Sequence, residues 1–311
     1  METYSLIPQL HDTSVALGYF DGCHMGHLSV IRAAKADSLT LCVLSIGKPY
    51  IIDRFGSPVE TRLIPPSEER RILDAQGVAY FIRPPFDSLR DMSGEEFFRD
   101  IIVDALGAKR VVCGCDFRFG RGAACGVDEL RDLAERYGVE CVVCPEVSFE
   151  GQKISSTCIR ELLSDGNIPT VNRMLGRNYG YSIPIVHGMC LARTLGAPTI
   201  NQPLPPCLYP MRRGVYASRV LLDGEWRCGV TNIGVKPTIS GSEERLPLSE
   251  TWIPGYSGNL YGQNIRTELL AFLRDERRFG SLDELKHAIH DDAELAKSLF
   301  TEASSGSPSL F

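Results

Sequence analysis

The chain has 311 residues, of which 43% are hydrophobic and 23% are charged, and its formal net charge is −6. This composition is typical of a globular protein with room for two domains, and it excludes the disordered and fibrous classes. The charge gives no basic field for nucleic acid or a membrane surface, and no apolar stretch approaches the roughly 18 residues of a membrane span.

The first residues, METYSLIPQLHD, lack the basic and apolar regions that open a secretory signal peptide. Eleven cysteines without such a signal are expected to be reduced thiols, which predicts a cytoplasmic protein. Cys141 and Cys144 form a CxxC, but a zinc site needs a second pair of ligands at matching spacing, and none is present. We therefore interpret these two thiols, and likewise Cys113 and Cys115, as side chains of buried strands.

In the first half of the chain, short apolar segments alternate with helical patterns. The expected strands are residues 14–18, 39–46, 79–82, 110–113 and 140–143. The expected helices are residues 26–36, 94–106, 127–137 and 156–164. Strands that alternate with helices indicate βαβ units, so this half is predicted to form a doubly wound parallel sheet.

The pattern changes after residue 166. The expected strands there are residues 182–186, 214–222, 227–233 and 265–273, which are separated by Gly and Pro. Short strands with turn signals between them predict a small antiparallel β-barrel, which is followed by expected helices at residues 282–290 and 293–303. The fold class is therefore α/β, with a parallel-sheet domain over residues 1–170 and a barrel domain with C-terminal helices over residues 171–311.

The segment GYFDGCHMGH at residues 18–27 joins the first expected strand to the first expected helix. A helix N-terminus offers unpaired N–H groups and a positive dipole end, which suits a phosphate. His24 and His27 share one face of the starting helix and can donate hydrogen bonds to charge developing on an α-phosphate, so we predict that both are catalytic. The alternative, a histidine pair that only caps the helix, fits the pattern less well, and no third ligand supports zinc. The loop residues expected to bind ATP are Gly18, Phe20, Asp21 and Gly26.

A second segment, KISSTCIR at residues 153–160, brings hydroxyl groups to another expected helix start. Such residues are common helix caps, so the segment indicates a phosphate site only together with the histidine loop. In that combination Ser155, Ser156 and Thr157 are expected to bind ATP. Arg160 is a candidate catalytic residue that neutralises the β- and γ-phosphates.

Both segments resemble the nucleotidyltransferase module of bacterial bifunctional riboflavin kinase/FMN adenylyltransferases (FAD synthetases). GCDFRFG at residues 114–120 is similar to that family's G-x-D-F-R-F-G segment. The resemblance implies that FMN is adenylylated by ATP to FAD with release of pyrophosphate, with Mg²⁺ as cofactor. The residues that it places on the flavin side of the site are Asp116, Phe117, Arg118 and Phe119. FMN needs little activation, because its phosphate carries roughly −1.5 to −2 charge at neutral pH and is already a nucleophile.

The second half contains PTIN at residues 198–201 and a carboxylate at Glu250. Thr199 and Asn201 offer the hard oxygen ligands that Mg²⁺ prefers, and Glu250 can accept a proton from a hydroxyl. The order of these segments resembles the riboflavin kinase module of the same family. The resemblance implies that Gly196, Pro198, Thr199 and Asn201 bind ATP with Mg²⁺, and that Glu250 is the base for the 5′-hydroxyl of riboflavin.

The chain departs from the family pattern in places. Ala192 replaces the usual Gly before Arg193, Ala197 replaces a Phe, and the stretch around Glu250 is altered. In the first half, SIGKP at residues 45–49 replaces a histidine-containing F-x-P-H-P. The alternatives are an FMN adenylyltransferase with a degenerate kinase, a nucleotidyltransferase for a nicotinate or pantetheine phosphate, and a non-catalytic flavin-binding protein. DFRFG and the barrel argue against the second, and a candidate base argues against the third.

Overall fold

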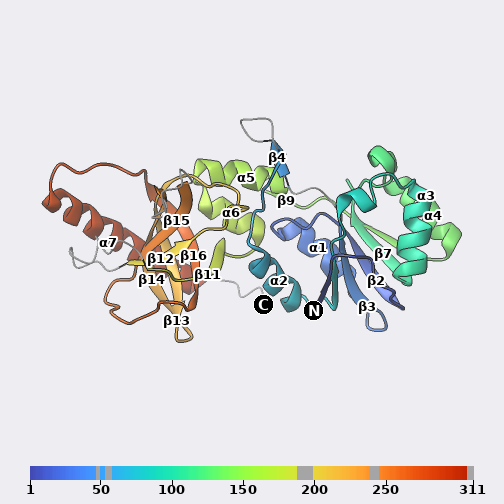
Figure 1. The fold of residues 1–311 in the computed structure, drawn as a ribbon, viewed down its shortest axis with the longest axis horizontal. Helices are drawn as coiled ribbons and strands as arrows, with labels where there is room; N and C mark the ends of the chain where they lie inside the picture. The colour runs from blue at the N-terminus through green and yellow to red at the C-terminus, as the bar shows by residue number, and fades with distance from the viewer. Residues whose placement is uncertain (47–49, 53–57, 188–198, 238–244, 307–311) are drawn as a thin grey trace. The chain divides into compact units, whose positions relative to one another are not determined.

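The computed structural model describes residues 1–46, 50–52, 58–187, 199–237 and 245–306. The chain divides into two compact units (Figure 1). The first unit is Met1–Glu60 with Glu69–Ser156, and the second is Thr61–Glu68 with Thr157–Phe311. Among the described residues, no helix combines the length and the apolar character that crossing a membrane requires.

The first unit is built on a six-stranded parallel sheet of order β1-β6-β3-β2-β7-β8. Its strands are β1 (Glu2–Tyr4), β2 (Thr13–Gly18), β3 (Thr40–Ser45), β6 (Tyr80–Ile82), β7 (Ala108–Gly114) and β8 (Glu140–Cys144). All but β1 confirm strands predicted from apolar runs. The edge strand β1 is missed because it is three residues long and begins with exposed polar side chains.

Helices cover both faces of this sheet, as a doubly wound fold requires. They are α1 (Met25–Ala33), α2 (Pro66–Ala75, which is shared with the second unit), η1 (Phe86–Ser88), α3 (Gly94–Glu96), η2 (Phe97–Ala105), η3 (Arg121–Ala123) and α4 (Val127–Tyr137). α1 lies on one side of the sheet, and α3 and α4 lie on the other (Figure 1). On the α4 side, Leu17 of β2 and Val111 of β7 share a buried cluster with Phe98 and Leu130.

The predicted helix over residues 94–106 exists, but its geometry changes along its length. Ser93 caps α3, since its hydroxyl accepts the Glu96 N–H while the Glu96 carboxylate accepts the Ser93 N–H. The chain then continues as the π-helical segment η2. Two short antiparallel pairs complete the unit: β4 (Tyr50–Ile52) with β5 (Pro58–Glu60), and β9 (Ser148–Phe149) with β10 (Gln152–Lys153).

The second unit contains a six-stranded antiparallel sheet of order β11-β16-β13-β14-β15-β12. Its strands are β11 (Gly180–Pro184), β12 (Thr199–Pro203), β13 (Gly214–Leu222), β14 (Glu225–Pro237), β15 (Arg245–Trp252) and β16 (Asn264–Arg274). The two edge strands approach each other, because the Gln202 amide donates to the Ile183 carbonyl and the Val186 N–H donates to the Asn201 carbonyl. The predicted antiparallel barrel is therefore confirmed as a nearly closed one.

The helices of the second unit are α5 (Ser156–Asp165), α6 (Ile168–Leu175) and α7 (Leu282–Gly306). The first residue of α5, Ser156, is assigned to the first unit. The two predicted C-terminal helices are one continuous helix, α7, which packs on β13, β14 and β16 (Figure 1). The sequence predicts that the first of these helices ends at residue 290 and that the second begins at residue 293. No break occurs, because the buried Asp292 carboxylate binds the Arg274 guanidinium at 2.7 Å.

The segment Thr61–Glu68 belongs to the second unit although its neighbours in sequence belong to the first. The Arg62 N–H donates to the Cys207 carbonyl at 2.6 Å, and the buried Glu68 carboxylate makes two hydrogen bonds with Arg266 of β16. Arg266 also binds Glu268, so opposite charges stay paired inside this unit.

The cysteines of the described residues are free thiols, and no group of three metal-binding side chains occurs within these residues. Cys113 and Cys144 are buried in strands, as predicted, and Cys141 of β8 is half-buried. The prediction for Cys115 is wrong. This thiol lies just beyond the end of β7 and is exposed.

Candidate active sites

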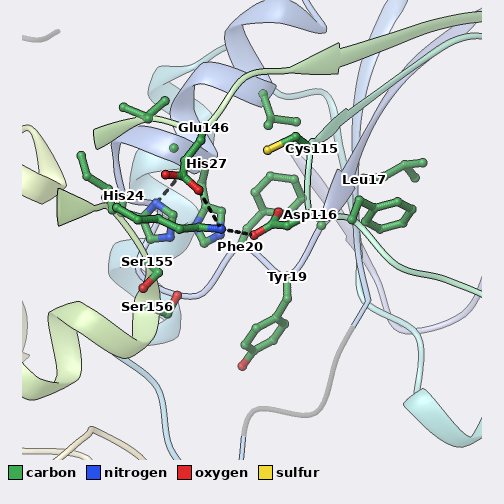
Figure 2. A pocket seen from close by; sticks show the side chains of 18 of the residues that line it. Leu17, Tyr19, Phe20, His24, His27, Cys115, Asp116, Glu146, Ser155 and Ser156 are labelled. Carbon is green, nitrogen blue, oxygen red and sulfur yellow. Dashed lines mark hydrogen bonds and ion pairs between the residues drawn. The ribbon is translucent and has the colours of Figure 1, made fainter. Parts of the chain in front are cut away.

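A cavity of about 360 Å³ lies in the first unit where β2 and β7 end and α1 begins (Figure 2). The carboxyl edge of a parallel sheet is where doubly wound folds bind ligands. The predicted site residues that line it are Gly18, Phe20, His24, Gly26, His27, Asp116, Phe117, Arg118, Ser155 and Ser156. We call this cavity the histidine pocket.

The two histidines of the pocket are locked together at the start of α1. His24 is the N-cap residue, and its Nδ1 accepts the N–H of His27 at 3.3 Å. The two imidazole rings stack with centroids 3.6 Å apart, and the His27 ring also meets Phe20 edge-on (Figure 2). A Cβ on Gly26 would lie 3.2 Å from ring atoms of His24, so the glycine leaves space for this stack. Helix capping is therefore one role of His24, and it orients the pair along one wall of the cavity.

The first turn of α1 carries no acidic side chain, so the positive end of its dipole is not neutralised locally. Ser156, the first residue of α5, also lines the pocket, and its hydroxyl donates to the carbonyl of Asp21 at 2.9 Å. Asp21 therefore supports the site through its backbone, and it is not among the residues that line the cavity. Hydroxyls and helix N–H groups thus face the same space as the histidines.

Lys153 is a cation of the histidine pocket that the sequence analysis does not select as a site residue. Its Nζ binds the Asp116 carboxylate at 2.8 Å and the Glu146 carboxylate at 3.2 Å, and all three line the cavity (Figure 2). The hydrogen bond with Asp116 raises the pKa of Lys153, so the ammonium is charged at neutral pH. The only sequence signal is its place directly before the ISST run.

The DFRFG loop contributes unequally to the pocket. Phe117 lines it, whereas Phe119 does not and packs its ring against Phe117 and Phe97 in the core. Arg118 lines the cavity, but its guanidinium donates to the carbonyls of Ala123 and Ala124 at 2.9 and 3.1 Å. Arg118 therefore holds its own loop, and the predicted flavin contact of Phe119 is not part of the cavity wall.

Two of the predicted phosphate-binding residues, Thr157 and Arg160, belong to the second unit. There an Nη atom of Arg160 lies 3.5 Å from the carbonyl of Thr61, and the guanidinium is stacked over the ring of Tyr209. Their contribution to the histidine pocket stays a prediction.

The second unit has its own cavity, of about 410 Å³. Thr199 and Asn201 of β12 contribute oxygen-bearing side chains to its wall, as do the tyrosines, the serine and the asparagine among its other lining residues. The other lining residues are Ile185, Ile200, Ile253, Tyr256, Ser257, Gly258, Asn259, Leu260 and Tyr261. Gly196 and Pro198, which the sequence predicts as ATP-binding, lie outside the described residues, as do Ala192 and Ala197.

Strand register places the predicted base beside the predicted metal ligand. Asn201 of β12 is directly opposite Glu250 of β15, and Glu250 is directly opposite Asn232 of β14. Residues directly opposite in a sheet share a face, with Cβ atoms about 4.5–5.5 Å apart. We call these three residues the Glu250 row. Unlike Asn201 and Glu250, Asn232 is not among the site residues predicted from the sequence.

The Glu250 row lies on the outer face of the barrel. The neighbouring positions Gln202, Thr231, Ser249 and Thr251 are fully buried and point the other way, into the barrel. Asn201 is only 5% exposed, and its Oδ1 accepts no hydrogen bond from any group that the structure describes. A buried carbonyl oxygen of this kind fits the donor set of a hard cation.

Comparisons with known proteins cover almost the whole chain. The model of a family described as FAD synthetase matches residues 6–158, and that of a family described as riboflavin kinase matches residues 175–300. The bifunctional riboflavin kinase/FMN adenylyltransferase of Escherichia coli K12 is 33% identical over 310 residues, which cover 95% of this chain and 97% of that protein. The enzyme of the same name from Bacillus subtilis is 30% identical and covers 92% of both chains.

One solved structure resembles nearly the whole fold. A crystal structure described as a macrolide-efflux protein from Streptococcus pneumoniae matches with a TM-score of 0.80 and 29% identity. The match covers 94% of this chain and 95% of that one, so the two proteins share both units.

Proposed function

The chain belongs to the family of bifunctional riboflavin kinase/FMN adenylyltransferases, and we propose that it carries both activities. In this proposal riboflavin and ATP give FMN and ADP, and FMN with a second ATP gives FAD and pyrophosphate. Residues 171–311 perform the first reaction and residues 1–170 the second. The cytoplasm, where ATP and reduced thiols occur together, is the proposed location.

Adenylyl transfer is assigned to the histidine pocket. The observation that carries this assignment is the stacked His24–His27 pair on the cavity wall at the N-terminus of α1. Because Nδ1 of His24 accepts the helix N–H, its Nε2 is the nitrogen that would meet a phosphate oxygen. The imidazoles and the helix N–H groups would stabilise charge on the α-phosphate while the FMN phosphate attacks in line and pyrophosphate leaves.

Phosphorylation of riboflavin is assigned to the Glu250 row and the cavity beside it. An alcohol is a poor nucleophile, so a base within reach of the 5′-hydroxyl is required, and Glu250 supplies it. The buried Oδ1 of Asn201 and the hydroxyl of Thr199 would hold Mg²⁺, whose charge would stabilise the ATP phosphates. The metal that Asn201 holds with ATP and the proton acceptor Glu250 would then lie side by side.

Two parallel reactions test this function. Purified protein receives Mg²⁺ and ATP with riboflavin in one tube and FMN in the other, and the flavins are resolved by chromatography. We expect FMN and then FAD in the first tube, and FAD with pyrophosphate in the second. FAD missing from the FMN tube would contradict the adenylyltransferase assignment, and unchanged riboflavin would contradict the kinase alone.

A further inference from the structure

Asn232 lies beside Glu250 on the side away from Asn201, because β15 runs between β12 and β14. The three side chains project from the same face of the sheet. Under the proposed function, Asn201 faces the nucleotide and its metal. The opposite flank of Glu250, formed by Asn232, is then the position beside the hydroxyl that Glu250 deprotonates.

The orientation of the Asn232 amide is fixed by one hydrogen bond. Its Nδ2 donates to Oε1 of Glu276 at 3.1 Å. A Cβ on Gly234, the next residue on the same face of β14, would lie only 2.7 Å from that Glu276 oxygen. The glycine therefore makes room for the Glu276 carboxylate, and the carboxylate binds the NH₂ end of the amide.

The other end of this amide lacks a partner. Oδ1 of Asn232 is buried and accepts no hydrogen bond from any group within the described ranges. Buried acceptors are normally paired, and an exception next to a proposed catalytic base indicates a missing ligand. Because Nδ2 is held by Glu276, the amide presents an acceptor and not a donor to that ligand.

From this arrangement we propose that Asn232, oriented by Glu276, is a specificity-determining residue of the kinase site that accepts a hydrogen bond from a polyol hydroxyl of the acceptor substrate. This inference rests on the proposed kinase function. Riboflavin fits it, since its ribityl chain carries further hydroxyls next to the 5′-hydroxyl that loses its proton. Asn232 would then position that chain for attack and would not itself take part in proton transfer.

The experiment measures steady-state phosphorylation of riboflavin, with lumiflavin as a competitive inhibitor. Lumiflavin has a methyl group in place of the ribityl chain, so it reports on the flavin ring alone. In Asn232→Ala we expect the KM for riboflavin to rise about tenfold, as for loss of one hydrogen bond. The KM for ATP and the inhibition constant of lumiflavin should not change.

Glu276 provides a matched pair of variants that leave Asn232 in place. Glu276→Gln keeps an oxygen that can accept from the Asn232 amide, so the KM for riboflavin should stay as in the wild type. Glu276→Ala releases the amide, and the KM should rise in the same direction by about threefold. Glu225→Ala is the control, because Glu225 lies on β14 with Asn232 but its side chain is 77% exposed. This variant should leave the KM for riboflavin unchanged.

Three results would overturn the inference: an increase in the KM for ATP in Asn232→Ala, equally weakened inhibition by lumiflavin, or an unchanged KM for riboflavin. A change in tryptophan fluorescence in Asn232→Ala would show that this variant does not fold like the wild type. The two Glu276 variants then test the proposal, and equal KM values for riboflavin in both would contradict it. Wild-type protein that phosphorylates no riboflavin would instead contradict the kinase function itself.

Discussion

The histidine pair of the first unit and the Glu250 row of the second differ in how far apart their residues lie in the sequence. His24 and His27 come from a single turn of α1, and the hydrogen bond that orients them is made within that turn. Asn201, Asn232 and Glu250 come from three strands and meet only through register. The arrangement of the histidine pair therefore depends on local geometry, and that of the Glu250 row depends on correct pairing of the barrel strands.

The two sites also differ in the groups that they present. The histidine pocket combines two imidazoles with a helix N-terminus, which suit phosphate groups, and its Lys153 ammonium is paired with the carboxylates of Asp116 and Glu146. The Glu250 row combines a carboxylate with two buried amide oxygens, which suit a cation and hydroxyl groups. Each set matches the reaction proposed for its unit, and a variant in one site should leave the other reaction intact.

The largest expected effect is on the Glu250 row. Glu250→Gln keeps the size of the side chain but removes the carboxylate proposed to accept the proton. We expect FMN formation from riboflavin to fall about 1000-fold, with FAD formation from FMN unchanged. Initial rates of both reactions measure this, with the exposed Glu225→Gln as the control. Equal loss of both activities would show that the two sites are not separate.

The next effect is the reverse experiment on the histidine pocket. His27→Ala removes one imidazole of the stack and, with it, one of the donors proposed to bind the α-phosphate. FAD formation from FMN should fall about 100-fold while riboflavin phosphorylation continues. His11→Ala, an exposed histidine of the same unit, should behave as the wild type. A His27→Ala protein that keeps full adenylyltransferase activity would remove the histidine pair from the mechanism.

A smaller effect tests whether the stack itself matters. Gly26→Ala places a methyl group 3.2 Å from the His24 ring, so the ring must move by a few tenths of an ångström. We expect FAD formation to fall about tenfold, since small displacements of catalytic groups are costly. Stability should not fall with it, because Ala is favoured over Gly inside a helix by about 1 kcal/mol. Ser29→Ala in the same helix is the control, and full activity of Gly26→Ala would show that the stack is not required.

The same contrast explains what the sequence predicts. The parallel sheet and the start of α1 follow from apolar runs and from one contiguous motif, and the structure confirms them. The helix α6 is missed because it is only eight residues long and starts at Ile168–Pro169. The sequence predicts two helices where α7 is continuous. The ion pair between Asp292 and Arg274 joins residues far apart in the chain, so local sequence does not reveal it.

The site residues that the sequence does not reveal also depend on tertiary contacts. Asn232 becomes a candidate only when the β14–β15 register places it opposite Glu250. Lys153 becomes one only when Asp116 and Glu146 lie within hydrogen-bond distance of it. Conversely, Phe119 belongs to a motif but packs into the core, because the loop turns its ring toward Phe97.

The smallest expected effect concerns stability at alkaline pH, which should fall more in the first unit than in the second. Burial raises the pKa of Cys42 and of Cys113 from 9.0 to about 12. A raised pKa means that folding favours the protonated thiol, so this stabilisation is complete below pH 9 and is lost as the pH rises toward 12. At about pH 10 each thiol should cost the first unit about 1 kcal/mol.

In the second unit, burial raises the pKa of Cys158 and Cys228 from 9.0 by a smaller amount, and it raises the pKa of Tyr181 and Tyr216 from a higher ordinary value of 10.0. The second unit should therefore lose less stability than the first near pH 10. The two tryptophans of the chain, Trp226 and Trp252, both lie in the barrel. In urea their fluorescence therefore reports unfolding of the second unit, whereas circular dichroism reports unfolding of both units. Between about pH 9 and pH 10 the transition seen only by circular dichroism should move to lower urea. In Cys42→Ala/Cys113→Ala that shift should shrink, because neither thiol remains to ionise. An equal shift in both proteins would mean that other groups control the alkaline response of the parallel-sheet unit.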